Sequence, residues 1–250
     1  MNVRRTAENY RRICTQEVKI CQFWDFVVLT ASDEKQRKYY EGFLEARKRT
    51  GLLPFHKSCM YMVVADPPTN MGNRIGAGGA TFWALAAVKS ELIKRGRKAD
   101  IYNKMRILMI HSGGYASRNP NCCATGKIFS PIPSFVFPGL TVPTLFDFKM
   151  AQYAPIAEMC QPGLMIVAGD VCNVFDPFQE CFYFVQPGCI GIGHLDSFNY
   201  ASDHGVYVVD NGGFEYDKIL KCQQYCHKFQ SNELNNVGAN VAGIVGGVFL

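Results

Sequence analysis

Three groups suited to handling phosphate follow one another in the middle of the chain. An apolar run at residues 107–110 leads to the glycine pair Gly113 and Gly114, and Arg118 and Lys127 come next. Glycines after a strand let backbone N–H groups approach phosphate oxygens without an intervening side chain. Arg118 can bind phosphate through two parallel hydrogen bonds, and Lys127 can neutralise a transferring phosphate. A glycine pair alone is commonly a plain turn, but the series favours phosphoryl or nucleotidyl transfer.

A second glycine segment precedes a helix predicted at residues 81–95. Gly76, Gly78 and Gly79 lead directly to Thr81, which can cap the first turn of that helix. Free N–H groups at such a helix start can bind a phosphate or hold a nucleotide. No Gly-Lys-Ser/Thr follows, and the spacing misses the third glycine of a dinucleotide-binding pattern. A tight strand-to-helix connection without a ligand explains the segment equally well.

Asp170 follows the apolar run at residues 164–168. A carboxylate at the carboxyl end of a central strand lies where α/β enzymes bind ligands, and it suits Mg²⁺ that bridges phosphates. Asp170 is therefore the favoured metal ligand, ahead of Asp176 and Asp210, although aspartate at this position can equally cap a turn.

Two further polar segments have both a functional and a structural interpretation. His204, followed by Gly205, can contact sugar hydroxyls, but a loop histidine with a local hydrogen bond fits as well. The stretch at residues 33–36 is more typical of the charged first turn of a helix than of a catalytic site.

Alternating apolar runs and helix-length segments must position these groups. Strands are predicted at residues 26–30, 61–65, 107–110 and 164–168, and helices at residues 34–50, 81–95 and 145–160. Further strands are expected at residues 189–193 and 205–210, with a turn at residues 210–213. Strands apolar on both faces and joined by helices predict a mostly parallel sheet of the doubly wound, Rossmann-like α/β class, with ligands at the carboxyl ends of the strands.

The composition limits the classes of partner that the chain is expected to bind. The 250 residues include 26 basic and 21 acidic side chains, a formal charge of +5 that helps attract nucleotides but is too scattered to predict nucleic-acid binding. The chain lacks an apolar run of membrane-spanning length and an apolar leader near its start, so we expect a cytoplasmic protein without a membrane partner. Its 11 cysteines are scattered, and reduced thiols explain them better than zinc ligands do.

Several blocks together resemble the sugar-1-phosphate nucleotidyltransferases, and within that class the GDP-fucose pyrophosphorylase (fucose-1-phosphate guanylyltransferase) family. The matching blocks are residues 23–36, 66–67 with 75–81, 110–118 with 126–129, and 204–210. In the wider class a glycine-rich loop is followed by Arg and then by Pro-Lys, and here Gly126 stands in place of that proline.

The resemblance implies that GTP and β-L-fucose 1-phosphate condense to GDP-fucose and pyrophosphate with Mg²⁺ as cofactor. It assigns Gly113, Gly114 and Arg118 to the triphosphate, Lys127 to the transferring phosphate, and Asp170 to the metal. The segment from Gly76 to Thr81 is assigned to the nucleotide. Because the sugar phosphate is already ionised, no general base is required.

The resemblance also predicts the domain organisation. We expect an N-terminal helical segment at residues 1–22 and an incomplete nucleotidyltransferase domain at residues 23–250, without the β-helix-like C-terminal region of the family. Three alternatives stay open: transfer to a different sugar 1-phosphate, a catalytically silent nucleotide-binding fragment, and a part of a longer chain fused to a fucokinase. The sequence does not predict an oligomeric state.

Overall fold

The computed structural model describes most of the first three quarters of the chain and short stretches of the remainder. The described residues are 3–17, 22–54, 59–68, 75–98, 103–114, 120–122, 125–132, 142–172, 175, 188–193, 205–209, 220–227, 241–242 and 247–249. They divide into two compact units, Met1–Gln186 and Pro187–Leu250.

The first unit is built on four parallel strands in the spatial order β2-β1-β3-β4. The strands are β1 (Phe26–Ala31), β2 (Met60–Ala65), β3 (Arg106–His111) and β4 (Gly163–Ala168). The helices are α1 (Val3–Cys14), α2 (Glu34–Arg49), α3 (Gly76–Lys94) and α4 (Leu145–Tyr153), with short 3₁₀ turns η2 (Pro120–Cys122), η3 (Lys127–Phe129) and η4 (Pro155–Glu158). The four strands predicted from apolar runs are confirmed to within one residue at each end, as is the parallel α/β sheet.

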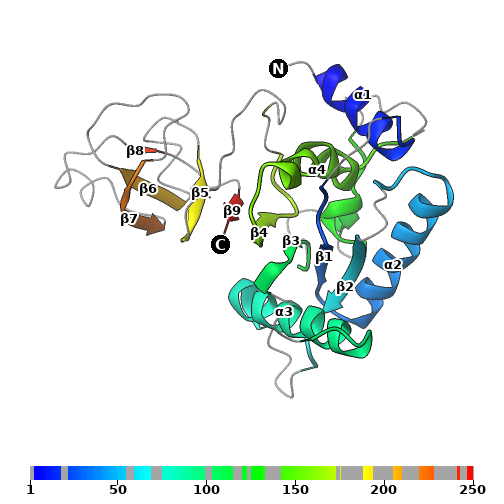
Figure 1. The fold of residues 1–250 in the computed structure, drawn as a ribbon, viewed down its shortest axis with the longest axis horizontal. Helices are drawn as coiled ribbons and strands as arrows, with labels where there is room; N and C mark the ends of the chain where they lie inside the picture. The colour runs from blue at the N-terminus through cyan, green and yellow to red at the C-terminus, as the bar shows by residue number, and fades with distance from the viewer. Residues whose placement is uncertain are drawn as a thin grey trace. The chain divides into compact units, whose positions relative to one another are not determined.

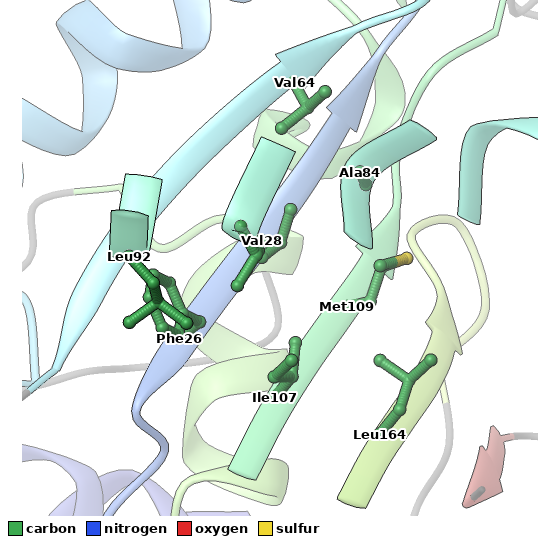
Figure 2. Close-up of a cluster of buried hydrophobic side chains, with 9 residues drawn as sticks. Phe26, Val28, Val64, Ala84, Leu92, Ile107, Met109 and Leu164 are labelled. Carbon is green, nitrogen blue, oxygen red and sulfur yellow. The ribbon is translucent and has the colours of Figure 1, made fainter. Parts of the chain in front are cut away.

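Helices cover the sheet on both of its faces, as the doubly wound prediction requires. Figure 1 shows α3 below the strands, α4 above them and α2 beside β2. Ala84 and Val88 of α3 belong to the same buried cluster as Val28 of β1, and Figure 2 labels Ala84 and Val28 in this cluster. Successive side chains of a strand point to opposite faces, and Val27 and Leu29 are as fully buried as Val28. Both faces of β1 therefore contribute to the core, at about 1.5–3 kcal/mol for each large apolar side chain.

The strand order places a topological switch point between β1 and β3. The connection through α2 leads from β1 outward to β2, and the connection through α3 passes back over β1 to β3. In open α/β sheets the crevice outside the carboxyl ends at such a point is the usual ligand site. The residues that follow β1 and β3 here are Ser32 and Ser112.

One ion pair joins the helices α2 and α4. Arg47 Nη2 lies 2.8 Å from Asp147 Oδ2, and the Asp147 side chain is completely buried. Asp147 also accepts hydrogen bonds from the amide and the hydroxyl of Thr144, which closes a capping box at the start of α4. Burial raises the pKa of Asp147 despite these partners.

Two predicted helix boundaries are wrong. Helix α3 begins at Gly76 and not at Thr81, so the glycine segment lies in its first turns. The absence of a side chain at Gly79 leaves space for the side chain of Ile75, because a Cβ on Gly79 would lie only 2.9 Å from Ile75 Cβ. The helix predicted to reach residue 160 ends at Tyr153. Pro155 follows, and its ring lacks an N–H group and obstructs the preceding turn.

The second unit contains short antiparallel strands. They are β5 (Ile190–Ile192) paired with β9 (Gly247–Phe249), and β6 (Gly205–Val209) paired with β7 (Cys222–His227) and β8 (Val241–Ala242). The two strands predicted in this part of the chain are confirmed, and the turn predicted at residues 210–213 lies outside the described residues. No helix in the described part of either unit has the length and apolarity needed to cross a membrane.

Candidate nucleotide and phosphate site

A small pocket at the carboxyl end of the parallel sheet collects most of the predicted phosphate-handling residues. Its volume is ≈ 90 Å³, and its walls come from the ends of β3 and β4 and from the turn η3. The lining residues are His111, Ser112, Gly113, Gly114, Lys127, Ile128, Gly169 and Asp170. Gly113, Gly114, Lys127 and Asp170 were predicted from three separate segments, and the fold brings these segments to one cavity.

Backbone atoms form the wall of the pocket nearest the sheet. A Cβ on Gly113 would lie 3.1 Å from the Ala31 carbonyl carbon and from Ser32 N, so a side chain there would press on the end of β1. A Cβ on Gly169 would lie 2.7 Å from the His111 carbonyl oxygen, to which Gly169 N already donates a hydrogen bond. These close approaches explain why glycine occupies both positions.

Lys127 reaches across the pocket to Asp170. Its Nζ lies 2.7 Å from Asp170 Oδ2, and the two side chains are 39% and 47% exposed. Lys127 opens the turn η3, whose next two residues, Ile128 and Phe129, are buried. The Phe129 ring stacks on Phe43 of α2 with 4.0 Å between ring centroids. The backbone of the turn is thus anchored in the core, while the ammonium group stays accessible to a ligand.

His111, the last residue of β3, contacts the hydroxyl of Thr81 through its Nε2 atom. Thr81 Oγ1 donates its single hydrogen to Ala77 O at 2.9 Å and lies 2.9 Å from His111 Nε2. When the hydroxyl hydrogen is donated to Ala77 O, the contact with His111 requires the proton on Nε2. Burial lowers the pKa of His111, which favours the neutral ring in the wall of the pocket.

Comparison with known proteins identifies the family to which the chain belongs. Residues 99–248 match the model of the fucose pyrophosphorylase domain. The chain belongs to the fucose pyrophosphorylase family. It is similar to the fucose-1-phosphate guanylyltransferase of Mus musculus (31% identical over 231 residues, 90% of this chain and 36% of that protein) and of Homo sapiens (32% identical over 209 residues, 83% and 32%). It is also similar to the bifunctional fucokinase/GDP-fucose pyrophosphorylase of Arabidopsis thaliana (32% identical over 203 residues, 74% and 19%).

The chain spans about a third of the length of the mouse and human relatives that it matches. No solved structure matches it. Every residue that lines the pocket lies within the stretch matched by the fucose pyrophosphorylase domain, whereas the glycine segment at the start of α3 precedes that stretch. The family match and the pocket therefore point to the same part of the chain.

The predicted residues of α3 lie apart from the pocket lining. Gly76 and Gly78 border open space, since a Cβ on either would have no neighbour within 4 Å among the described residues. The prediction that Thr81 caps the helix is wrong, because its hydroxyl bonds to Ala77 O inside α3. Thr81 is linked to the pocket through His111 instead. Nucleotide binding by this segment stays a prediction.

The remaining predicted residues fall elsewhere. Arg118 and His204 lie outside the described residues. Gly205 begins β6 in the second unit, where a Cβ would overlap the ring and hydroxyl of Tyr225 on the neighbouring strand β7. Packing against Tyr225 explains the glycine at this position, and its contact with a sugar stays a prediction.

Lys149 is a residue near the pocket that the sequence interpretation missed. It lies on α4, its side chain is 1% exposed, and its Nζ donates to Val171 O at 2.6 Å, one residue after Asp170. Burial lowers the pKa of Lys149 to about 8. The sequence carried a signal, because this lysine stands directly between the apolar residues Phe148 and Met150.

The donor set of the pocket fits Mg²⁺. In the part of the chain that the structure describes, no three His, Cys, Asp or Glu side chains gather at one point. Mg²⁺ usually binds through one or two carboxylates together with substrate phosphates and water, and it needs no complete protein cage. Asp170 supplies one such carboxylate, beside backbone and an ammonium group suited to phosphate.

Proposed function

We propose that this chain transfers GMP from GTP to L-fucose 1-phosphate, forming GDP-L-fucose and pyrophosphate. One observation supports it above the others: a member of the fucose pyrophosphorylase family gathers glycine backbone, the Lys127 ammonium and the Asp170 carboxylate in one pocket at the carboxyl end of its sheet. This combination suits a reaction in which the negative charge of a triphosphate must be bound and then stabilised as it moves to the leaving pyrophosphate.

In the proposed reaction an ionised phosphate oxygen of fucose 1-phosphate attacks the α-phosphorus of GTP. The new P–O bond forms as the bond between the α-phosphorus and the bridging oxygen breaks, and the electron pair leaves with pyrophosphate. No proton has to be removed, so the residues act by position and charge. Lys127 stabilises charge on the α-phosphate, and the backbone at Gly113 and Gly114 holds the triphosphate.

Asp170 would hold Mg²⁺ against the phosphates, where the ion would neutralise charge on the triphosphate and on the departing pyrophosphate. Arg118 is proposed as a further triphosphate ligand, and His204 and Gly205 as sugar contacts. Lys127 and Asp170 would each exchange their mutual contact for a ligand, Lys127 for phosphate and Asp170 for the metal.

The test is pyrophosphate release by the purified chain with GTP, Mg²⁺ and fucose 1-phosphate, beside the variant Lys127→Ala. We expect release that needs both substrates and Mg²⁺ and that the variant loses. Equal release with UTP or ATP, or with other sugar 1-phosphates, would favour a different nucleotidyltransferase specificity. GTP binding without release by the folded chain would favour a silent binding module.

A further inference from the structure

Two buried polar side chains of α2 lie next to the pocket without lining it, and they bind the backbone around it. Gln36 and Tyr40 are 3% and 0% exposed, and they stand one helical turn apart on the same face of α2. Residues 33–36 were interpreted above as a charged helix start. Asp33 does cap α2, since its side chain accepts a hydrogen bond from Gln36 N at 2.8 Å. The capping role leaves the buried amide and phenol unexplained.

Both side chains bind the residues that follow the two switch-point strands. Tyr40 Oη donates to Ser112 O at 2.9 Å, immediately after β3. Gln36 Oε1 accepts hydrogen bonds from Ser32 N at 2.8 Å and from Ser32 Oγ at 3.0 Å, immediately after β1. A Cβ on Gly113 would press against Ser32, so these bonds fix the surroundings of the glycine backbone in the pocket.

The same two side chains border the turn that carries Lys127. A Cβ on Gly126 would overlap the Tyr40 hydroxyl and would lie 3.1 Å from Gln36 Nε2. Gly126 has a φ of +73°, a backbone conformation that residues with a Cβ rarely adopt, whatever space surrounds them. The Tyr40 ring also meets Phe129, the last residue of this turn, edge to face at 5.1 Å between centroids. Gln36 and Tyr40 thus lie between the strand ends on one side and the Lys127 turn on the other.

We propose that Tyr40 and Gln36 are positioning residues that set the spacing between the glycine backbone at the end of β3 and the Lys127 ammonium. This inference deepens the proposed function, because the spacing matters only if the backbone and Lys127 bind the same phosphate chain. The Tyr40 hydroxyl acts through Ser112 and Gly126 and does not itself reach the ligand. Burial raises the pKa of Tyr40, so the phenol remains a hydrogen-bond donor over the working pH range.

The alternative is that Tyr40 is an ordinary core residue. It differs from its neighbour Tyr39, whose ring contacts Phe129 as well but is 40% exposed. Tyr39→Phe is therefore a matched control for Tyr40→Phe: each substitution removes one hydroxyl from α2, and only the second removes the hydrogen bond to Ser112. Gln36→Met, which retains length and loses the amide, is the second variant. Thermal unfolding establishes that each variant is folded.

The first readout needs no ligand. The rate at which an amine-acylating reagent modifies Lys127 is measured by mass spectrometry, with exposed Lys94 of α3 as the internal control. In Tyr40→Phe we expect Lys127 to react roughly fivefold faster, the factor that corresponds to the loss of one buried hydrogen bond, while Lys94 is unchanged. Tyr39→Phe should leave both rates at the wild-type values. An unchanged Lys127 rate in folded Tyr40→Phe and Gln36→Met would overturn the inference.

The second readout is GTP affinity, measured by calorimetry, in a cycle of wild type, Tyr40→Phe, Lys127→Ala and the double variant. Tyr40→Phe should weaken binding by roughly fivefold when Lys127 is present and have little effect when it is absent. Equal effects in both backgrounds would show that Tyr40 does not act through Lys127. If the wild-type chain binds no GTP, the proposed function fails, and the acylation rates still decide whether Tyr40 positions Lys127.

Discussion

Lys127 Nζ lies 2.7 Å from Asp170 Oδ2, so the cation and the anion assigned to the proposed reaction form an ion pair with each other. Both side chains are more than a third exposed, and exposed pairs of this kind contribute about 0–1 kcal/mol to stability. The pair is therefore weak enough to separate when phosphate and a metal ion compete for it. In the absence of a ligand, the ion pair holds both charged groups at the same pocket.

Lys127→Ala should separate activity from stability. We expect turnover to fall by about 100-fold or more, because removing one charge-stabilising group from a transferring phosphate has effects of that order. Thermal unfolding should change little, since the exposed ion pair contributes little. Pyrophosphate release and a melting curve measure the two effects, with Lys94→Ala on α3 as a control for the loss of one surface charge. Turnover at the wild-type level would remove Lys127 from the mechanism.

Asp170→Asn should raise the Mg²⁺ concentration needed for half-maximal turnover, because the amide lacks the charge that a hard cation prefers. The variant loses the ion pair with Lys127 as Lys127→Ala does, so the two variants should have similar melting temperatures. A magnesium titration of turnover makes the measurement. The same magnesium dependence in wild type and Asp170→Asn would exclude Asp170 as a ligand.

Gly126→Ala should destabilise the fold by about 2 kcal/mol or more, since it adds a left-handed backbone penalty to an overlap with the buried Tyr40. Gly42, in the middle of α2, is the matched control, because a Cβ there meets nothing within 4 Å. Gly42→Ala should stabilise the helix by up to about 1 kcal/mol. Urea unfolding of both variants gives the comparison, and equal midpoints would contradict the packing described around Tyr40.

The core of the site was predictable because parallel strands bring their carboxyl ends to one edge. Apolar runs located β3 and β4, so Gly113 and Asp170, which follow these strands closely, had to approach that edge. Lys127 stands farther along the chain, and the turn η3 brings it there. The start of α3 was not predictable from local preference, because Gly76, Gly78 and Gly79 disfavour a helix in isolation, whereas the burial of Ala80 and Thr81 that follow them is apparent only in the fold. The end of α4 was predictable, since Pro155 stands in the sequence.

The sequence interpretation missed the buried polar side chains beside the pocket for a different reason. Gln36, Tyr40 and Lys149 have residue types that are usually found at the surface or in an ordinary core, and their burial depends on which elements cover them. Their hydrogen bonds join residues 22 to 72 positions apart, except for the local contact between Gln36 and Ser32. Such partners become apparent only when the sheet order is known.

Lys149 predicts a pH dependence of stability. Its pKa is about 8 in the folded chain and near 10.5 when unfolded, so between these values the unfolded chain binds more protons. Stability from this group therefore increases as the pH rises, by up to about 1.4 kcal/mol per unit. Lys149→Met lacks this contribution, and its stability relative to wild type should fall between pH 8 and pH 10. Urea unfolding at several pH values measures the difference, with exposed Lys89→Met as the control, and a difference independent of pH would contradict the burial of the charge.

His111 predicts a second pH effect, in the acidic range. Because burial lowers its pKa below 6.5, the unfolded chain binds more protons than the folded chain just below pH 6.5, and stability falls as the pH drops through this window.

Nitrogen NMR of the His111 ring should show the proton on Nε2. Thr81→Val should cost about 1–3 kcal/mol by leaving that N–H group without its acceptor. Thr50→Val removes a hydroxyl that likewise bonds a carbonyl four residues earlier, and it serves as the control. A proton found on Nδ1 would contradict the assigned tautomer.

The backbone wall at Gly113 and Gly169 restricts which substitutions this chain can accept. No larger residue fits either position without displacing a strand end, so point substitution cannot reshape that side of the cavity. If the pocket holds phosphate as proposed, the wall that holds it is therefore the part of this chain least able to change by single substitution. A change of the proposed sugar or base would then have to arise at residues other than Gly113 and Gly169.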